Sequence, residues 1–147
     1  PGLQILRNAL IEDGHDVYVF APASDRSGLA ASVSLTVPFI DLGDQQVIVQ
    51  GPPATCVVAG LSFMEQNLLD TSASDADDSV IGTPDLVVVG ISDGFPTGPQ
   101  TLHSSSVGAA LTALGRGIPT LTVAGLPPAV QEEDYYTNVA DFTVRFI

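Results

Sequence analysis

Apolar positions along the chain recur with two periods, one typical of helices and one typical of strands. Leu3, Leu6 and Leu10 share one face of a helical pattern that stops at Gly14, a residue that favours a helix end. This pattern predicts a helix over residues 2–13. A second helical pattern follows a Gly-Pro-Pro turn, and its apolar face is made by Val57, Leu61, Met64 and Leu68.

Short runs rich in β-branched and aromatic residues predict five strands. They cover residues 16–22, 34–42, 45–51, 85–91 and 120–125. Pro38 interrupts the second run, so we expect that strand to be irregular or to lie at a sheet edge. The run over 85–91 is the most continuously apolar, as expected of a parallel strand that is buried on both faces.

The alternation of strands and helices predicts an α/β domain with a mostly parallel sheet, and a length of 147 residues suits a single domain. Ligands in such sheets bind beyond the carboxyl ends of the strands. The loops after Pro22 and Ile91 are therefore the expected binding loops. Residues 70–83 are polar and acidic and are expected to form a surface loop.

The charge balance narrows the choice of partner. The chain has 17 acidic residues, four arginines and no lysine, for a net charge of −13. Such a surface repels nucleic-acid polymers and anionic membranes, which favours small ligands or metal ions, although the same charge also serves solubility alone. Cys56 is the only cysteine and has no internal disulfide partner. The sequence leaves the location of the protein open, and both a cytoplasmic and a periplasmic or secreted protein agree with it.

Three consecutive serines, Ser104 to Ser106, precede a run of apolar residues at helical spacing. At a helix start their hydroxyls join unpaired backbone N–H groups, and this combination suits an anion such as phosphate. The alternative is that one serine simply caps the helix, which is the commoner use of serine at this position.

The loop from Asp25 to Gly28 also follows a strand. Arg26 is one of few cations available to an anionic ligand, and Ser27 beside a glycine is able to approach a metal or a phosphate closely. The alternative for this loop is an Asx or Ser turn.

Several familiar motifs are either absent or disfavoured by the residues around them. Gly90 to Gly94 match the G-x-S-x-G pattern of serine hydrolases, but no helix is expected directly after it, and no histidine lies in the required place. A chain without lysine has no Walker A loop, and G-x-G-x-x-G is absent. The acids Asp75, Asp77 and Asp78 lack the glycine and glutamate of an EF-hand, and we assign His15 a structural role.

Four segments carry a family resemblance. In chain order they are PGLQILRNALIEDGHDVYVFAPASDRSGLAASVSLT, GPPATCV, PDLVVVGISDG and HSSSVGAALTALGRGIPT. Their order and spacing, over most of residues 1–125, resemble the SurE family of survival-protein-E-type 5′-nucleotidases and acid phosphatases. The resemblance implies a Rossmann-like α/β fold and hydrolysis of phosphate monoesters, typically nucleoside monophosphates, with a divalent metal such as Mg²⁺ or Mn²⁺.

The resemblance also implies roles for particular residues. Ser27 and Ser92 match metal-site positions, and Gly94 matches a glycine of the family's phosphate-binding region. Phosphate binding is assigned to Ser104, Ser105 and Ser106, with Ser105 standing where the family has glycine.

Two departures from the family pattern affect the expected activity. Ser92 replaces an asparagine ligand, and the family's Asp-Asp pair would precede Pro1. Two neutral serines do not supply the charge that a divalent cation needs, so the chain as given is expected to be catalytically impaired. The resemblance further implies truncation at both ends, loss of the first strand with a gap in the sheet, and a homo-oligomer at full length, with residues 131–147 as a helix joining the absent part.

Two other interpretations of the sequence remain open. One is a non-catalytic phosphate-binding or nucleotide-binding protein, and the other is a purely structural relic of the fold.

Overall fold

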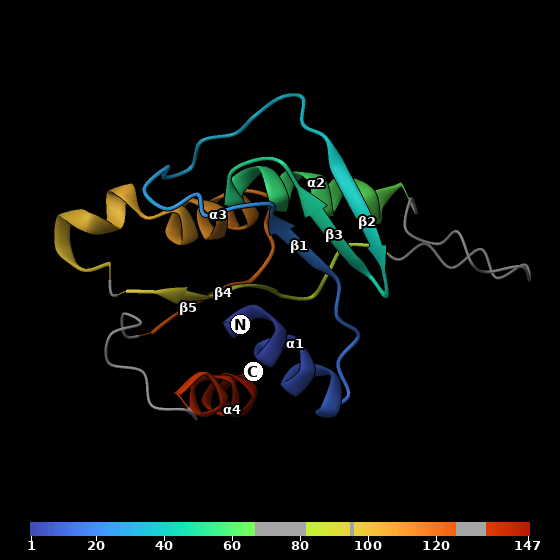
Figure 1. Cartoon of the computed structure of the whole chain (residues 1–147), viewed down its shortest axis with the longest axis vertical. Helices are drawn as coiled ribbons and strands as arrows, with labels where there is room; N and C mark the ends of the chain where they lie inside the picture. Colours follow the sequence, from blue (N-terminus) through green and yellow to red (C-terminus); the bar gives the residue numbers. More distant parts are fainter. Residues whose placement is uncertain (67–81, 95, 126–134) are drawn as a thin grey trace, which may run out of the picture.

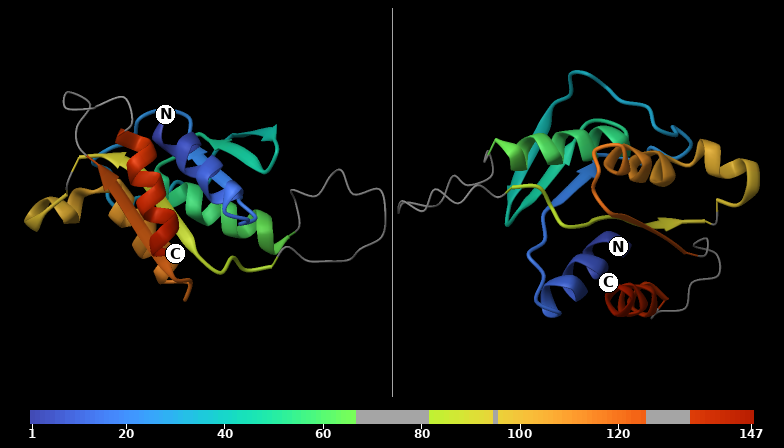
Figure 2. Two further views of the ribbon diagram at one scale, coloured as in Figure 1. Left: turned by 90° about the horizontal axis from the view of Figure 1, so that it is seen from below. Right: turned by 180° about the vertical axis from the view of Figure 1, so that it is seen from behind.

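A computed structural model describes residues 1–66, 82–94, 96–125 and 135–147 of the chain. Helices cover both faces of the strands, so the molecule has three layers, with the strands between two layers of helices (Figures 1 and 2). Helices α2 (Pro53–Glu65) and α3 (Ser105–Leu114) pack together on one face, and α1 (Gly2–Glu12) and α4 (Tyr135–Phe146) pack together on the other. The predicted α/β architecture is therefore confirmed.

The strands form two sheets. Strand β3 (Gln46–Val49) lies between β1 (Val19–Pro22), to which it is parallel, and β2 (Phe39–Gly43), to which it is antiparallel. Strands β4 (Val87–Asp93) and β5 (Thr120–Gly125) form a parallel pair. Within the described ranges no ladder joins β1 to β4, which agrees with the gap in the sheet expected from the sequence.

The gap explains why one prediction was wrong. The apolar run that forms β4 was expected to be buried on both faces, yet Val87 to Ser92 are only half-buried and Asp93 is exposed. In the described part of the chain β4 pairs with β5 along one edge only, so its other edge leaves the side chains partly open to solvent.

Two apolar clusters hold the layers together. Leu6 and Leu10 of α1 pack with Ala140 of α4, and Val47 and Val49 of β3 pack with Cys56 of α2. The first cluster packs α1 against α4, and the second packs α2 against the three-stranded sheet. The first cluster confirms Leu6 and Leu10 of the predicted apolar face of the first helix, whereas the second contains Cys56, which lies outside the face predicted for the second helix.

Some element boundaries differ from the sequence expectations. Of the predicted second strand only the part after Pro38 is β-structure, and this strand lies at a sheet edge, as the proline indicated. On the second helix Leu61 and Met64 are buried and Val57 is half-buried, whereas Leu68 lies outside the described residues. Most of the predicted acidic loop 70–83 also lies outside them.

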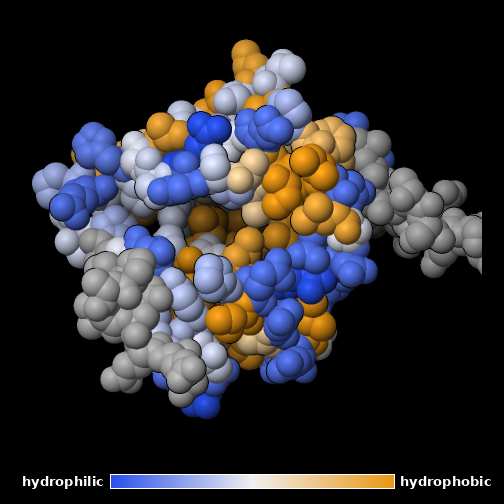
Figure 3. All heavy atoms as spheres, viewed as in Figure 1, coloured by the Kyte–Doolittle hydropathy of each residue, from blue (hydrophilic) through white to orange (hydrophobic). Residues whose placement is uncertain are grey.

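The edge strand β2 is apolar and open to solvent. Every residue of this strand is exposed, and its large side chains, Phe39, Ile40 and Leu42, are each more than half exposed. Apolar atoms gather over this strand in the space-filling view (Figure 3). Phe39 packs edge-on against Phe63 of α2, with ring centroids 4.8 Å apart, which attaches the exposed strand to the helix behind it.

Candidate phosphate site at the start of α3

The loop after β1 lies directly against the start of α3. The Ser105 hydroxyl donates to the Arg26 carbonyl at 2.6 Å and accepts from the Leu29 N–H at 2.9 Å. The Ala30 N–H donates to the His103 carbonyl at 3.3 Å. Two segments that the sequence singled out separately are therefore in contact, although they lie more than 70 residues apart.

The three serines at this helix start have different surroundings. Ser104 is the N-cap, since its hydroxyl accepts from the Val107 N–H at 3.3 Å. Ser105 is buried, and its one proton is used on the Arg26 carbonyl. Ser106 is half-buried in the first turn of the helix. The capping interpretation thus describes Ser104, and phosphate binding by these serines stays a prediction.

The helix start follows a short element that the sequence analysis treated as a loop. A 3₁₀ helix, η1 (Gly98–His103), leads into α3. The arrows of β1 and β4 both point toward the side of the molecule on which η1 lies (Figure 1). The polar loops therefore gather at the carboxyl ends of the strands, where ligands bind in open α/β sheets.

The 25–28 loop contains the Asx turn that was the alternative to a ligand site. Both the N–H and the hydroxyl of Ser27 donate to Asp25 Oδ1, at 2.9 and 2.6 Å. The hydroxyl bond of Ser27, followed by its N–H bond, lowers the pKa of the exposed Asp25 carboxyl. A negatively charged carboxylate therefore lies beside the hydroxyl that the family resemblance places at a metal.

The end of β4 is attached to the neighbouring elements. The Ser92 hydroxyl lies 3.3 Å from the Val123 carbonyl of β5, and the Gly94 N–H donates to the Gly125 carbonyl at 2.7 Å. From α4, the Tyr136 hydroxyl donates to Asp93 Oδ1 at 2.8 Å. Sequence reasoning missed this last contact, because only the fold brings α4 to this strand end.

The described residues do not fit a complete divalent-metal site. Among them there is no group of three or more His, Cys, Asp or Glu side chains placed to hold a metal ion. The predicted ligands Ser27 and Ser92 are neutral, and both hydroxyls hydrogen-bond to protein oxygens. Mg²⁺ and Mn²⁺ need hard, largely anionic oxygens, which this pair alone does not provide.

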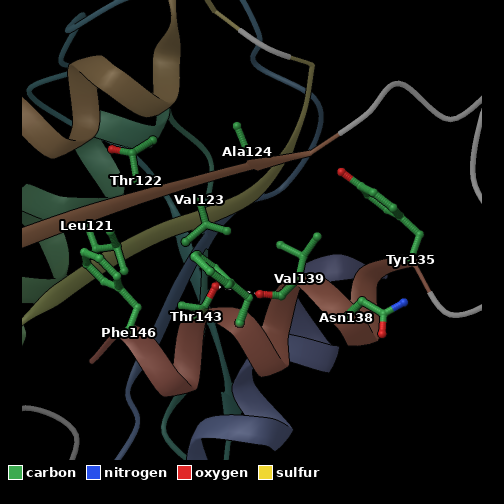
Figure 4. A pocket seen from close by; sticks show the side chains of 10 residues that line it. Leu121, Thr122, Val123, Ala124, Tyr135, Asn138, Val139, Thr143 and Phe146 are labelled. Carbon is green, nitrogen blue, oxygen red and sulfur yellow. Dashed lines mark hydrogen bonds between the residues drawn. The ribbon is translucent and has the colours of Figure 1, made fainter.

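An apolar groove lies elsewhere, between β5 and α4. Its volume is about 370 Å³. Figure 4 shows its lining, which includes Leu121, Val123, Val139 and Phe146. Its Thr143 hydroxyl is bonded to the Val139 carbonyl of the same helix. The groove offers no cationic side chain to an anion and is distinct from the loops at the start of α3.

Two smaller expectations concern acidic and basic side chains. His15 lies at the surface, with its Nε2 3.3 Å from an Asp13 carboxylate oxygen, and its structural role stays a prediction. Asp75, Asp77 and Asp78 lie outside the described residues. No helix in the part that the structure describes is both long and apolar enough to cross a membrane.

The fold and the gathered loops define a Rossmann-like α/β domain with polar loops at the carboxyl ends of its strands. The chain belongs to the SurE family, because the family described as "Survival protein SurE" matches residues 1–147.

Individual relatives support this membership. The chain is 34% identical over 125 residues to "5'-nucleotidase SurE" of Lawsonia intracellularis, an alignment that covers 82% of this chain and 44% of that protein. It is 35% identical over 137 residues to the protein of the same name from Xanthomonas oryzae pv. oryzae, covering 93% and 48%. The chain spans about half the length of the curated relatives it matches.

A solved structure agrees with the fold. The SurE protein of Aquifex aeolicus superposes with a TM-score of 0.78 at 26% identity, over 99% of this chain and 53% of that chain. The agreement over nearly the whole chain confirms the Rossmann-like α/β assignment.

Proposed function

We propose that the complete protein hydrolyses phosphate monoesters, with nucleoside 5′-monophosphates as the substrate class. The observation that carries this proposal is the contact between the 25–29 loop and the start of α3, in a chain whose relatives are named 5′-nucleotidases. The family resemblance assigns Ser27 of the loop to the metal and the serines at the start of α3 to phosphate. Arg26 of the same loop adds a cation that suits an anionic ligand.

The residues of this chain bind and orient the phosphoryl group. The Ser105 and Ser106 N–H groups at the start of α3 and the Ser106 hydroxyl donate to phosphoryl oxygens, and the helix dipole adds about 0.3–1 kcal/mol at an exposed end. Arg26 supplies positive charge in a chain whose net charge is −13. Hydrogen-bond donors that are already in position before the reaction stabilise the negative charge that develops on the phosphoryl oxygens.

The family resemblance also supports a divalent cation, which neutralises phosphoryl charge and activates water. The described residues by themselves do not form a complete ligand set for this ion. We therefore assign no catalytic step to the ion in the chain as given. We propose that the ligand set is completed by polypeptide that precedes Pro1 in the gene product.

The open edges of β1 and β4 support the same extension. Within the described residues β1 and β4 belong to separate sheets, and no strand joins them. A hollow near the middle of one face has apolar atoms at its base (Figure 3). We propose that a preceding strand fills this position. The extended protein should then melt at a higher temperature than residues 1–147, and equal melting temperatures would remove this support.

Exposed apolar surface supports a homo-oligomer of the complete protein. Phe142 and Phe146 of α4 stack on each other with centroids 6.4 Å apart, yet they are 70% and 66% exposed. Light scattering of the full-length product tests this proposal, and a monomer at micromolar concentration would contradict it.

The decisive experiment is a phosphatase assay on the full-length product, whose N-terminus is first fixed by transcript mapping and intact mass. Release of inorganic phosphate from nucleoside 5′-monophosphates is measured with Mg²⁺ or Mn²⁺ and after chelation by EDTA. Metal-stimulated, EDTA-sensitive release is expected. The proposal fails if a folded, full-length protein releases no phosphate with either metal.

The second candidate is a non-catalytic nucleotide-binding protein. It is favoured by Ser92, which stands where the family has asparagine and whose hydroxyl bonds to the Val123 carbonyl. Ser92→Asn in the full-length protein separates the candidates. A large rise in turnover indicates a weakened enzyme, whereas nucleotide binding without turnover in either form indicates a binding protein.

A further inference from the structure

Ser105 uses its hydroxyl to connect two segments. The side chain is buried, with 6% of its surface exposed. Its proton goes to the Arg26 carbonyl at 2.6 Å, and its oxygen accepts the Leu29 N–H at 2.9 Å. A hydroxyl has one proton, and phosphate oxygens need donors, so Ser105 in this arrangement does not donate to phosphate.

The contacts around Ser105 leave the loop little freedom. Within the loop, the Asx turn between Asp25 and Ser27 fixes the local backbone. On its far side, the Ala30 backbone lies so close to Gly108 of α3 that a Cβ there would be 2.2 Å from the Ala30 carbonyl carbon. The loop is therefore shaped by Asp25 and docked on α3 through Ser105 and Gly108.

We propose that Ser105 is a positioning residue for the phosphate site. Its hydrogen bonds to Arg26 and Leu29 fix the position of the loop against α3. The position of the loop in turn places the Arg26 guanidinium and the Ser27 hydroxyl relative to the first turn of the helix. This role rests on the proposed phosphomonoesterase function and replaces direct phosphate contact by Ser105.

The residue type matters because of this link. Glycine, which the family resemblance places at this position, has no hydroxyl and cannot make either hydrogen bond. In this chain Ser105→Gly should therefore impair the site, although it restores the family residue. A misplacement of about 1 Å in a site is enough to lower catalysis by about 100-fold.

The first test compares Ser105→Ala and Ser105→Gly with a matched control in the full-length protein. Thr112→Ala is the control. The described hydrogen bond of the Thr112 hydroxyl is a donation to the Gly108 carbonyl of the same helix, at 2.8 Å, so its loss does not affect the loop after β1. We expect kcat/KM for a nucleoside 5′-monophosphate to fall about 10-fold to 100-fold in both Ser105 variants and to stay near the starting value in Thr112→Ala. Ser105→Thr keeps the hydroxyl and should restore most of the activity.

A second readout reports the link itself. The Leu29 amide donates to Ser105, so its hydrogen exchange should quicken about 10-fold in Ser105→Ala relative to Thr112→Ala, as expected for the loss of one hydrogen bond. Overall melting temperatures identify any variant that has merely unfolded.

The third readout asks whether Ser105 acts through Arg26. In a double-mutant cycle, Arg26→Ala should reduce kcat/KM less in the Ser105→Ala background than in the unmodified protein, because the guanidinium is already misplaced. Additive effects, or a Ser105→Ala variant indistinguishable from Thr112→Ala, would overturn the positioning role while leaving the phosphatase function intact. A wild-type protein that neither hydrolyses monoesters nor binds inorganic phosphate would instead overturn both.

Discussion

Gly108 of α3 and Ala30 of the loop after β1 are in direct backbone contact. A Cβ built on Gly108 would lie 2.2 Å from the Ala30 carbonyl carbon and oxygen and 2.4 Å from the Ala31 nitrogen. Real Cβ atoms do not approach backbone this closely, so only glycine permits the observed docking. Ala30 itself has a φ of +50°, which is uncommon for a residue with a side chain. This contact requires an unusual backbone on one side and a missing side chain on the other.

Gly108→Ala should therefore destabilise the protein by about 1–3 kcal/mol, since the loop or the helix has to shift. Alanine alone would favour the helix by about 1 kcal/mol, so a net loss indicates the steric conflict. Chemical denaturation measures the free energy of unfolding. Gly115→Ala is the control, because Gly115 has an ordinary helical φ of −63° at the C-cap. Equal stabilities for the two variants would contradict the contact.

Sequence patterns predicted some parts of this structure well and could not predict others. Leu6 and Leu10 gave α1 within a residue of its end, because a helix face is encoded by neighbours three and four positions apart. The end of β1 at Pro22 was predicted correctly, whereas β4 runs two residues past the predicted end at Ile91, and ligand binding by the loops that follow stays a prediction. Nothing local, however, indicated that Ser105 would meet Arg26 and Leu29, since that contact depends on how α3 packs across the strands.

The same limit applies to β4. Its run of valines predicted a buried strand, but burial depends on neighbouring strands as well as on the strand's own residues. The bond between Tyr136 and Asp93 was likewise beyond reach, because it joins α4 to a strand end 43 residues earlier. The periodicity of the chain predicts its elements, whereas the partners of each element follow from the tertiary structure.

Ser27→Ala should raise the pKa of Asp25. The Ser27 hydroxyl and N–H hold that pKa below its ordinary value, and a depressed carboxyl pKa stabilises the fold above the unfolded value, near pH 4. This contribution is lost as the pH falls through the folded pKa. NMR titration of the Asp25 carboxyl measures the shift, with Ser24→Ala in the same loop as control. An unchanged Asp25 titration in Ser27→Ala would rule out this hydrogen bond as the main cause.

Cys56 should react slowly with thiol reagents in the native protein. Burial raises the pKa of its thiol to about 11 from an ordinary value of 9.0, and the thiolate is the reactive form. Because the raised pKa disfavours ionisation in the fold, stability should decrease as the pH rises from about 9 to about 11. Iodoacetamide labelling at pH 8, with and without denaturant, tests the prediction. Rapid labelling without denaturant would contradict it.

Leu6 and Phe142 should respond very differently to truncation. Leu6 is 3% exposed in the cluster between α1 and α4, and removing its side chain leaves a cavity, so Leu6→Ala should lower the free energy of unfolding by about 2–5 kcal/mol. Phe142 is a larger side chain, but it is 70% exposed, so Phe142→Ala should cost about 0.5 kcal/mol or less. Both are measured by denaturation of residues 1–147 at low protein concentration. A large loss for Phe142→Ala that grows with protein concentration would show instead that α4 contacts a second copy, because association makes apparent stability depend on concentration.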